Sequence, residues 1–159
     1  MPIDVFDYLK GLEQERYRAI IIHASPMMGS ILTTFSRKIC NHLGGKYLDL
    51  LDFFIQVPEL SQTIDRFDPE KFRNLLIQQS QSQSLMIVDR VDFLIDTWRR
   101  TERQDFYRLV NNQWDSYKEG MKARLIFCLQ TSQEIEALKI HDSQGKSRIL
   151  NLTDFNDIA

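Results

Sequence analysis

The strongest constraint on this chain is a set of short, continuously apolar runs separated by longer amphipathic segments. The run at residues 18–23 (RAIIIH) is rich in β-branched side chains, too short for a helix, and apolar on both faces. Such a strand is typical of a parallel sheet that helices cover on both sides. Four further runs predict four further strands, at 46–51 (KYLDLL), 84–89 (SLMIVD), 124–129 (RLIFCL) and 148–152 (RILNL).

Helical patterns fill the intervals between these runs. Over residues 30–43 the apolar positions recur at intervals of three and four, and the glycine pair at 44–45 is a typical helix end. The Asp-Pro pair at 68–69 is typical of a helix start, with the Asp as N-cap. The remaining expected elements are helices over 4–16, 106–117 (ended by Gly120) and 133–138, and a polar connection at 78–84.

Strands that alternate with helices imply βαβ units with right-handed crossovers. We therefore predict a three-layer α/β/α sandwich with a five-stranded parallel sheet. The 159 residues are expected to form one domain, with an N-terminal helix within 1–17 and a core over 18–152. Ligands of such sheets bind beyond the carboxyl ends of the strands, so a site is expected near His23 to Gly29, Asp89 and Gln130.

Composition narrows the class of protein. The chain has 20 Lys and Arg against 22 Asp and Glu, and this net charge of -2 excludes a uniformly basic nucleic-acid-binding surface. The apolar runs are far shorter than the roughly 20 residues that span a bilayer, and the first residues lack a signal-peptide pattern. Cys40 and Cys128 lie in apolar runs, which favours buried thiols in a reducing compartment. We expect a cytoplasmic protein that has no membrane partner.

The bend between the first strand and the following helix has the layout of a phosphate-binding loop, G-x-x-x-x-G-K-[ST]. Ala24 stands at the first Gly and Gly29 at the second, while Ser30 and Ile31 occupy the Lys and Ser/Thr positions. Only one fixed position of four is kept, but the buried strand before and the helix after have the right order. The candidate nucleotide-binding residues are Ser25, Pro26, Met27, Met28, Gly29, Ser30 and Ile31.

A carboxylate ends the third strand, because residues 85–88 are apolar and Asp89 follows. With the bend, this pattern resembles the P-loop NTPase superfamily, in the AAA-like branch. The resemblance covers about residues 18–152 and implies the strand order 5-1-4-3-2. It implies that Asp89 holds a magnesium ion through water, and that Gln130, at the end of the fourth strand, reads the γ-phosphate. Asp89 and Gln130 are thus the candidate catalytic residues, and Asp89 the candidate metal ligand.

The chain is also somewhat similar to small P-loop accessory proteins of bacterial phage-defence cassettes such as BREX. Departures from the superfamily pattern point away from catalysis. Ser30 offers one neutral hydrogen bond where a Lys would supply charge, and Ile31 has no oxygen for magnesium. Thr33 and Thr34 lie further along the helix and do not simply replace that hydroxyl, although a backbone nest at the bend could still attract an anion. ATP and magnesium are therefore expected to bind weakly or not at all.

Plainer interpretations of the same residues remain open. The bend could be an ordinary strand-to-helix connection, Asp89 could cap the following turn or form a salt bridge, and Gln130 could cap the helix near residue 133. The densest basic cluster comprises Trp98, Arg99, Arg100 and Arg103. It could contact nucleic-acid phosphates with Trp98 stacking on a base, or contact a partner subunit, but a solvated helix face is the commonest explanation.

Three hypotheses for function follow. The first is a regulatory or scaffolding subunit with weak or no ATP hydrolysis, working in a homo-oligomer or with partners such as an ATPase, a nuclease or a methyltransferase. The second is an active ATPase in which Arg90, Arg124 or Lys38 supplies the missing charge. The third is a nucleic-acid-binding adaptor that uses the region from Trp98 to Arg108.

Overall fold

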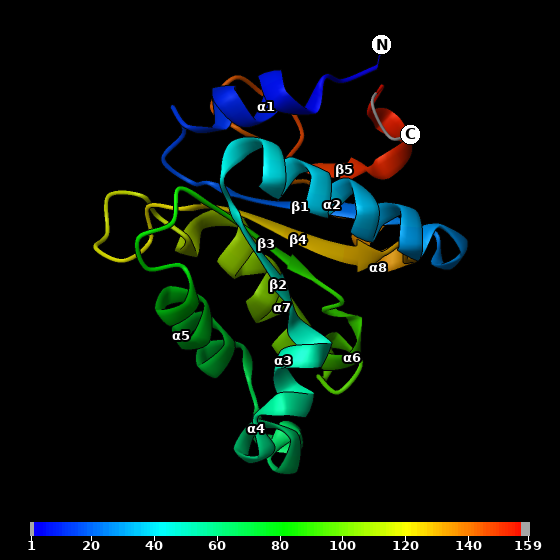
Figure 1. The fold of residues 1–159 in the computed structure, drawn as a ribbon, viewed down its shortest axis with the longest axis vertical. Helices are drawn as coiled ribbons and strands as arrows, with labels where there is room; N and C mark the ends of the chain where they lie inside the picture. Colours follow the sequence, from blue (N-terminus) through cyan, green and yellow to red (C-terminus); the bar gives the residue numbers. More distant parts are fainter. Residues whose placement is uncertain (1, 157–159) are drawn as a thin grey trace.

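Residues 2–156 are described by a computed structural model, in which five strands form one sheet (Figure 1). The strands are β1 (Ala19–Ala24), β2 (Lys46–Asp49), β3 (Leu85–Asp89), β4 (Arg124–Gln130) and β5 (Ile149–Asn151). Their order across the sheet is β2-β3-β4-β1-β5, and each neighbouring pair is parallel. This is the predicted order 5-1-4-3-2 read from the other edge, so the α/β class, the parallel sheet and the strand order are confirmed.

Helices cover both faces of the sheet. The helices α1 (Val5–Leu12) and α2 (Gly29–Leu43) lie on one face, and α5 (Pro69–Gln79) and α7 (Arg100–Arg108) lie on the other (Figure 1). A π-helical turn, Leu109–Gln113, extends α7. The shorter elements are α3 (Leu50–Gln56), α4 (Pro58–Gln62), α6 (Asp92–Ile95), α8 (Gln133–Glu136), and the 3-10 turns Pro26–Met28, Ile64–Arg66 and Leu152–Asp154.

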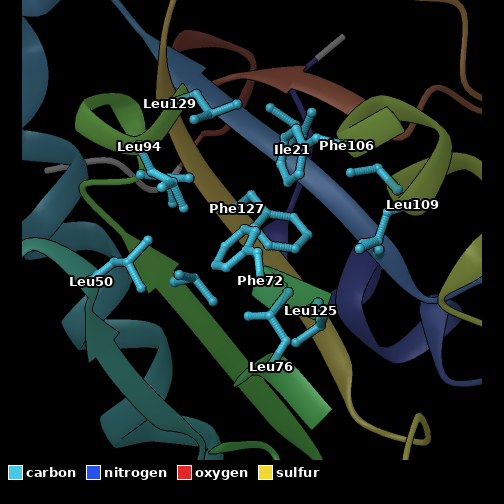
Figure 2. Packing of buried hydrophobic residues seen from close by; sticks show 14 of the residues in the cluster. Ile21, Leu50, Phe72, Leu76, Leu94, Phe106, Leu109, Leu125, Phe127 and Leu129 are labelled. Carbon is cyan, nitrogen blue, oxygen red and sulfur yellow. The ribbon is translucent and has the colours of Figure 1, made fainter. Parts of the chain in front are cut away.

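Alternate side chains of each strand enter two separate cores. On the α5 and α7 side, Ile21 and Phe127 belong to an aromatic-rich cluster, in which the Phe127 ring lies 5.9 Å from Phe72 and 5.0 Å from Phe106 (Figure 2). On the α1 and α2 side, Ile20, Ile22 and Ala24 of β1 belong to a second cluster, which is mostly aliphatic. All six residues of β1 are buried, as a strand that is apolar on both faces requires.

Two of the predicted helix signals are confirmed. The Asp68 carboxylate accepts a hydrogen bond from the Lys71 backbone N–H at 2.9 Å, and Pro69 is the first residue of α5. Gly44 ends α2 in the left-handed conformation, with φ of 69°, which is the αL cap that glycine favours.

The second strand was predicted over 46–51 but ends at Asp49, and Leu50 and Leu51 belong to α3. The reason is a cap, because the Asp49 carboxylate accepts a hydrogen bond from the Asp52 N–H and so starts a helix inside an apolar run. The helical turns between Leu50 and Arg66 were not predicted.

The helix predicted over 106–117 starts earlier, at Arg100, and its π-helical turn ends at Gln113 rather than near Gly120. The Trp114 indole is buried and donates to the Ala123 carbonyl at 2.7 Å. Tyr117 therefore lies outside the helix, with 78% of its surface exposed. The other ends shift less; α1 stops at Leu12 rather than near residue 16.

Through its hydrogen bonds, Arg148 connects the first residue of β1 with the π-helical turn. The residue is 2% exposed. Its guanidinium donates to the carbonyls of His141, Ala19, Val110 and Asn111 at 2.6–3.1 Å. Burial lowers the pKa of Arg148, and the four carbonyls supply the acceptors that a buried guanidinium needs.

Within residues 2–156, no helix has the length and apolar character needed to cross a membrane. Cys40 and Cys128 are both free and buried, as predicted. Among the same residues, no group of three or more His, Cys, Asp or Glu side chains is arranged to hold a metal ion.

Replacing Gly44 by Ala should lower the free energy of unfolding by about 1 kcal/mol, because the new Cβ is strained at positive φ. Replacing Gly11 by Ala should raise it by about 0.5–1 kcal/mol, because Gly11 lies within α1 and its added Cβ meets no atom within 4 Å. Urea denaturation measures both variants. A loss of stability in Gly11→Ala would contradict the helical assignment there.

Candidate functional site

The predicted site residues gather at one edge of the sheet. Asp49 of β2 pairs in register with Asp89 of β3, and Ala24 of β1 pairs with Gln130 of β4. Because the strands are parallel, these residues mark the carboxyl edge, where ligands of α/β sheets bind. The bend after β1, the candidate metal ligand and Gln130 therefore belong to the same edge, as the sequence predicted.

The bend itself is a continuous helical connection. Ser25 links β1 to the 3-10 turn Pro26–Met28, and α2 follows without a gap. The Met28 N–H donates to the Ser25 carbonyl at 2.9 Å, and the Gly29 N–H donates to Pro26. Gly29 has helical angles, φ of −58° and ψ of −42°, and no residue from 24 to 31 has a positive φ. A phosphate nest needs a left-handed residue beside a right-handed one, so the bend does not form the nest that it could have formed. Anion binding at the N-terminus of the helix stays a prediction.

The positions that would contact phosphate and magnesium carry the wrong side chains for that role. Ser30 is exposed and uncharged. Met27 is 93% exposed and Ile31 is 41% exposed, so the bend presents two apolar side chains to solvent. One helical turn separates these two residues, which places them on the same side of the segment.

The Asp89 carboxylate is enclosed by donors from the protein and is 3% exposed. One oxygen, Oδ2, accepts from the Thr33 hydroxyl at 2.6 Å and from the Tyr47 hydroxyl at 2.5 Å. The other, Oδ1, accepts from the Arg90 backbone N–H at 2.9 Å. Burial raises the pKa of Tyr47, and its bond to Asp89 raises it further. The Arg37 guanidinium lies 4.3 Å from the centre of the Tyr47 ring.

The hydrogen bond between Thr33 and Asp89 was not predicted. Thr33 lies one helical turn beyond Gly29 in α2, which argued against a role for Thr33 at the bend. A signal was present in the sequence, since Thr33 and Ser36 are small polar residues three apart beside the apolar face of a helix. Ser36 is also buried, and its hydroxyl lies 3.3 Å from the Cys128 sulfur. The Thr33 hydroxyl does not take the place of the hydroxyl that is missing at Ile31. It donates instead to Asp89, the carboxylate to which the resemblance assigns magnesium.

The cations suggested for the phosphate site lie elsewhere. Arg90 forms a bidentate ion pair with Asp49 of β2, on the side of β3 away from β1. Burial alone would raise the pKa of Asp49, but Arg90 and the Asp52 N–H outweigh it, and the pKa is lowered. Arg124 begins β4 at the opposite edge and donates to the Leu9 carbonyl at 2.9 Å. Lys38 lies about 13 Å along α2 from Gly29, at 1.5 Å per residue.

Gln130 is exposed at the end of β4, and its backbone N–H donates to Asp92 Oδ1 at 2.9 Å. The next residue, Thr131, shares a 2.8 Å hydrogen bond with His23 Nδ1. Ser132 rather than Gln130 caps α8, because its hydroxyl accepts from the Ile135 N–H. The role of Gln130 as a reader of phosphate stays a prediction.

The members of the basic cluster differ in burial: Trp98 is buried, Arg103 is partly buried, and Arg99 and Arg100 are exposed. Trp98 is 4% exposed, and its indole donates to the Phe67 carbonyl at 2.7 Å, so the expectation that Trp98 stacks on a base is wrong. Arg103 forms a bidentate pair with Glu134 at 2.9 and 3.0 Å. Only Arg99 and Arg100 of the predicted contact residues remain exposed.

These observations test whether magnesium-ATP fits the edge. The bend offers no nest and no lysine, and the Asp89 oxygens already accept three hydrogen bonds from the protein. A carboxylate that holds magnesium through water needs an accessible lone pair, and at 3% exposure the one site left on Asp89 has little contact with solvent. The residues present therefore do not fit the group that the resemblance implies.

Replacing Thr33 by Val removes one donor to Asp89 and keeps the shape of the side chain. The free energy of unfolding should fall by about 1–3 kcal/mol, because a buried carboxylate loses a hydrogen bond. The control Thr34→Val makes the same change at the next residue, which is exposed, and should stay within about 0.5 kcal/mol of wild type. Urea denaturation followed by circular dichroism compares the two; equal losses would argue against the Asp89 cluster.

Burial lowers the pKa of His23, against the opposing charges of Glu136 and Asp154. Acid therefore protonates this histidine in the unfolded chain first, and the folded state loses stability as pH falls below about 6.5. The loss from this group ends once pH is below its lowered folded-state pKa. His23→Gln should remove this part of the decline, and the exposed His42→Gln should retain it. Urea midpoints between about pH 7.5 and 5 measure the difference.

Comparison of the chain with models of known protein families, with curated proteins and with solved structures finds no match.

Proposed function

We propose that this protein is a P-loop-like domain that has exchanged nucleotide chemistry for a regulatory or scaffolding role in a larger assembly. The observation that carries the proposal is the enclosed Asp89 carboxylate. Three donors, from Thr33, Tyr47 and the Arg90 N–H, occupy three of its roughly four lone-pair sites. Because Asp89 is only 3% exposed, a magnesium-bound water has little access to the site that remains. The acid has become part of the packing between β2, β3 and α2.

Charge supports the same interpretation. Phosphoryl transfer depends on cations and N–H donors directed at the oxygens of the transferred group. At this bend the corresponding positions are Ser30 and Ile31, while Arg90 is paired with Asp49. An active ATPase is therefore the weaker alternative.

A role in an assembly is supported by what the bend exposes. At the position of a phosphate loop, this bend carries two large apolar side chains that are exposed to solvent, Met27 and Ile31. Methionine adapts readily to the shape of a neighbouring surface. The resemblance to accessory proteins of phage-defence cassettes suggests a catalytic subunit as the neighbour, and a second copy of the chain is the other candidate.

The proposal predicts that titration with magnesium-ATP gives no binding that depends on Asp89, and no hydrolysis above the buffer rate. Calorimetry and a phosphate-release assay should give the same traces for wild type and for Asp89→Asn, a variant that keeps an acceptor oxygen and nearly the same shape. Low-micromolar affinity with turnover that Asp89→Asn abolishes would contradict the proposal.

A further inference from the structure

A cleft lies at the amino edge of the sheet, opposite the bend and Asp89. Its volume is about 620 Å³, within the usual range of ligand pockets. The walls come from segments that precede strands or end a helix. These are the loop before β1 with Arg16 and Tyr17, the loop before β4 with Tyr117, the end of the π-helical turn, and the loop before β5.

Two tyrosine rings and a guanidinium form a rigid stack at the rim. The Arg16 guanidinium carbon lies 5.2 Å from the centre of the Tyr17 ring and 4.9 Å from that of Tyr117. Asp115 holds Arg16 through Nε and Nη2 at 2.9–3.1 Å, and also accepts the Tyr117 N–H at 2.9 Å. The Ser116 N–H donates to the Arg16 carbonyl, so the two loops are fixed to each other. These bonds fix the backbone at Tyr117, and its exposed ring lies against the Arg16 guanidinium.

The remaining lining is polar and carries little net charge. Asn111, Asn112 and His141 add planar groups with hydrogen-bonding edges. The Glu15 carboxylate already accepts from Ser143, and Asp142 accepts from backbone N–H groups of its own loop. No aliphatic side chain contributes to the lining, whereas the centre of a protein–protein interface is usually apolar.

Arg148 lies at this cleft as well, where its burial gives it a distinct role. Its guanidinium bonds to four carbonyls, and within residues 2–156 it forms no ion pair with a carboxylate. Because only 2% of the residue is exposed and four backbone carbonyls already accept from it, Arg148 is assigned no contact with a ligand. The cleft thus combines flat stacking faces with amide edges.

We propose that this cleft binds a nucleobase, which stacks on Tyr117 and is recognised along its edge by the asparagine amides. Unpaired bases are held in this way, on aromatic rings and on arginine planes, in proteins that bind single strands. Two sources supply that chemistry, a free nucleoside and an unpaired base in a single strand. The site is at the opposite edge from Asp89 and does not depend on the proposed function.

The test uses the whole chain and two kinds of probe. Calorimetry measures binding of a free nucleoside, uridine or adenosine, and fluorescence anisotropy measures binding of a labelled single-stranded RNA of eight nucleotides. Tyr117→Ala should weaken binding by about five- to a hundredfold, the usual effect of removing one stacked ring. Tyr117→Phe should bind as wild type does, because the ring and not the hydroxyl stacks. Both variants should fold, since Tyr117 is mostly exposed.

The control is Arg99→Ala combined with Arg100→Ala, which alters the basic cluster on α7 and should leave binding unchanged. Binding of the RNA alone would identify the strand as the source, and binding of the nucleoside at similar affinity would identify the free base. Absence of binding to every probe, or binding that Tyr117→Ala does not weaken, would overturn the proposal. A loss in the arginine variant that equals the loss in Tyr117→Ala would overturn it as well.

Discussion

Parallel pairing of strands that are buried on both faces is the constraint on which the rest of this structure depends. Because β1, β3 and β4 carry apolar side chains on both faces, their polar residues lie at or next to the first or last residue of each strand. The sheet therefore has two chemically distinct edges. The carboxyl edge gathers Asp49, Asp89 and Gln130. The amino edge gathers Arg16 and Arg148 with the loops that lead into the strands.

At each edge, hydrogen bonds replace the contact with water of a buried ionisable side chain, and different groups supply them. At the carboxyl edge, the buried Asp89 carboxylate accepts from three donors, which come from α2, from β2 and from its own chain neighbour. At the amino edge, the charge of Arg148 is retained through backbone carbonyls. A buried charge keeps its ionised form only where such bonds replace its hydration. The three bonds to Asp89 stabilise the fold and, together with its burial, leave little room for a metal-bound water at that carboxylate.

Features that depend on the periodicity of apolar residues could be predicted from the sequence. Features that depend on contacts between distant residues could not. Continuous apolar runs predicted each strand, and the resemblance to P-loop NTPases implied the order of the strands across the sheet. Asp49 shows the limit, because its cap on α3 ends β2 inside a run that remains apolar through Leu51. Trp98 shows another, since a tryptophan among arginines is typical of a surface, and only the packing against the aromatic core places it inside. Thr33 and Tyr47 meet Asp89 across 56 and 42 residues of sequence, which no local pattern reports.

The central claim is that the Asp89 oxygens are committed to protein donors and are closed to a metal–nucleotide complex. Paramagnetic broadening measures this directly, in amide NMR spectra recorded while manganese-ATP is added to the isotopically labelled protein. The account predicts that the Asp89, Arg90 and Thr33 amide signals keep their intensity relative to the core of the sheet. Selective broadening of those three signals, with a loss of the Tyr47 hydroxyl contact, would contradict it.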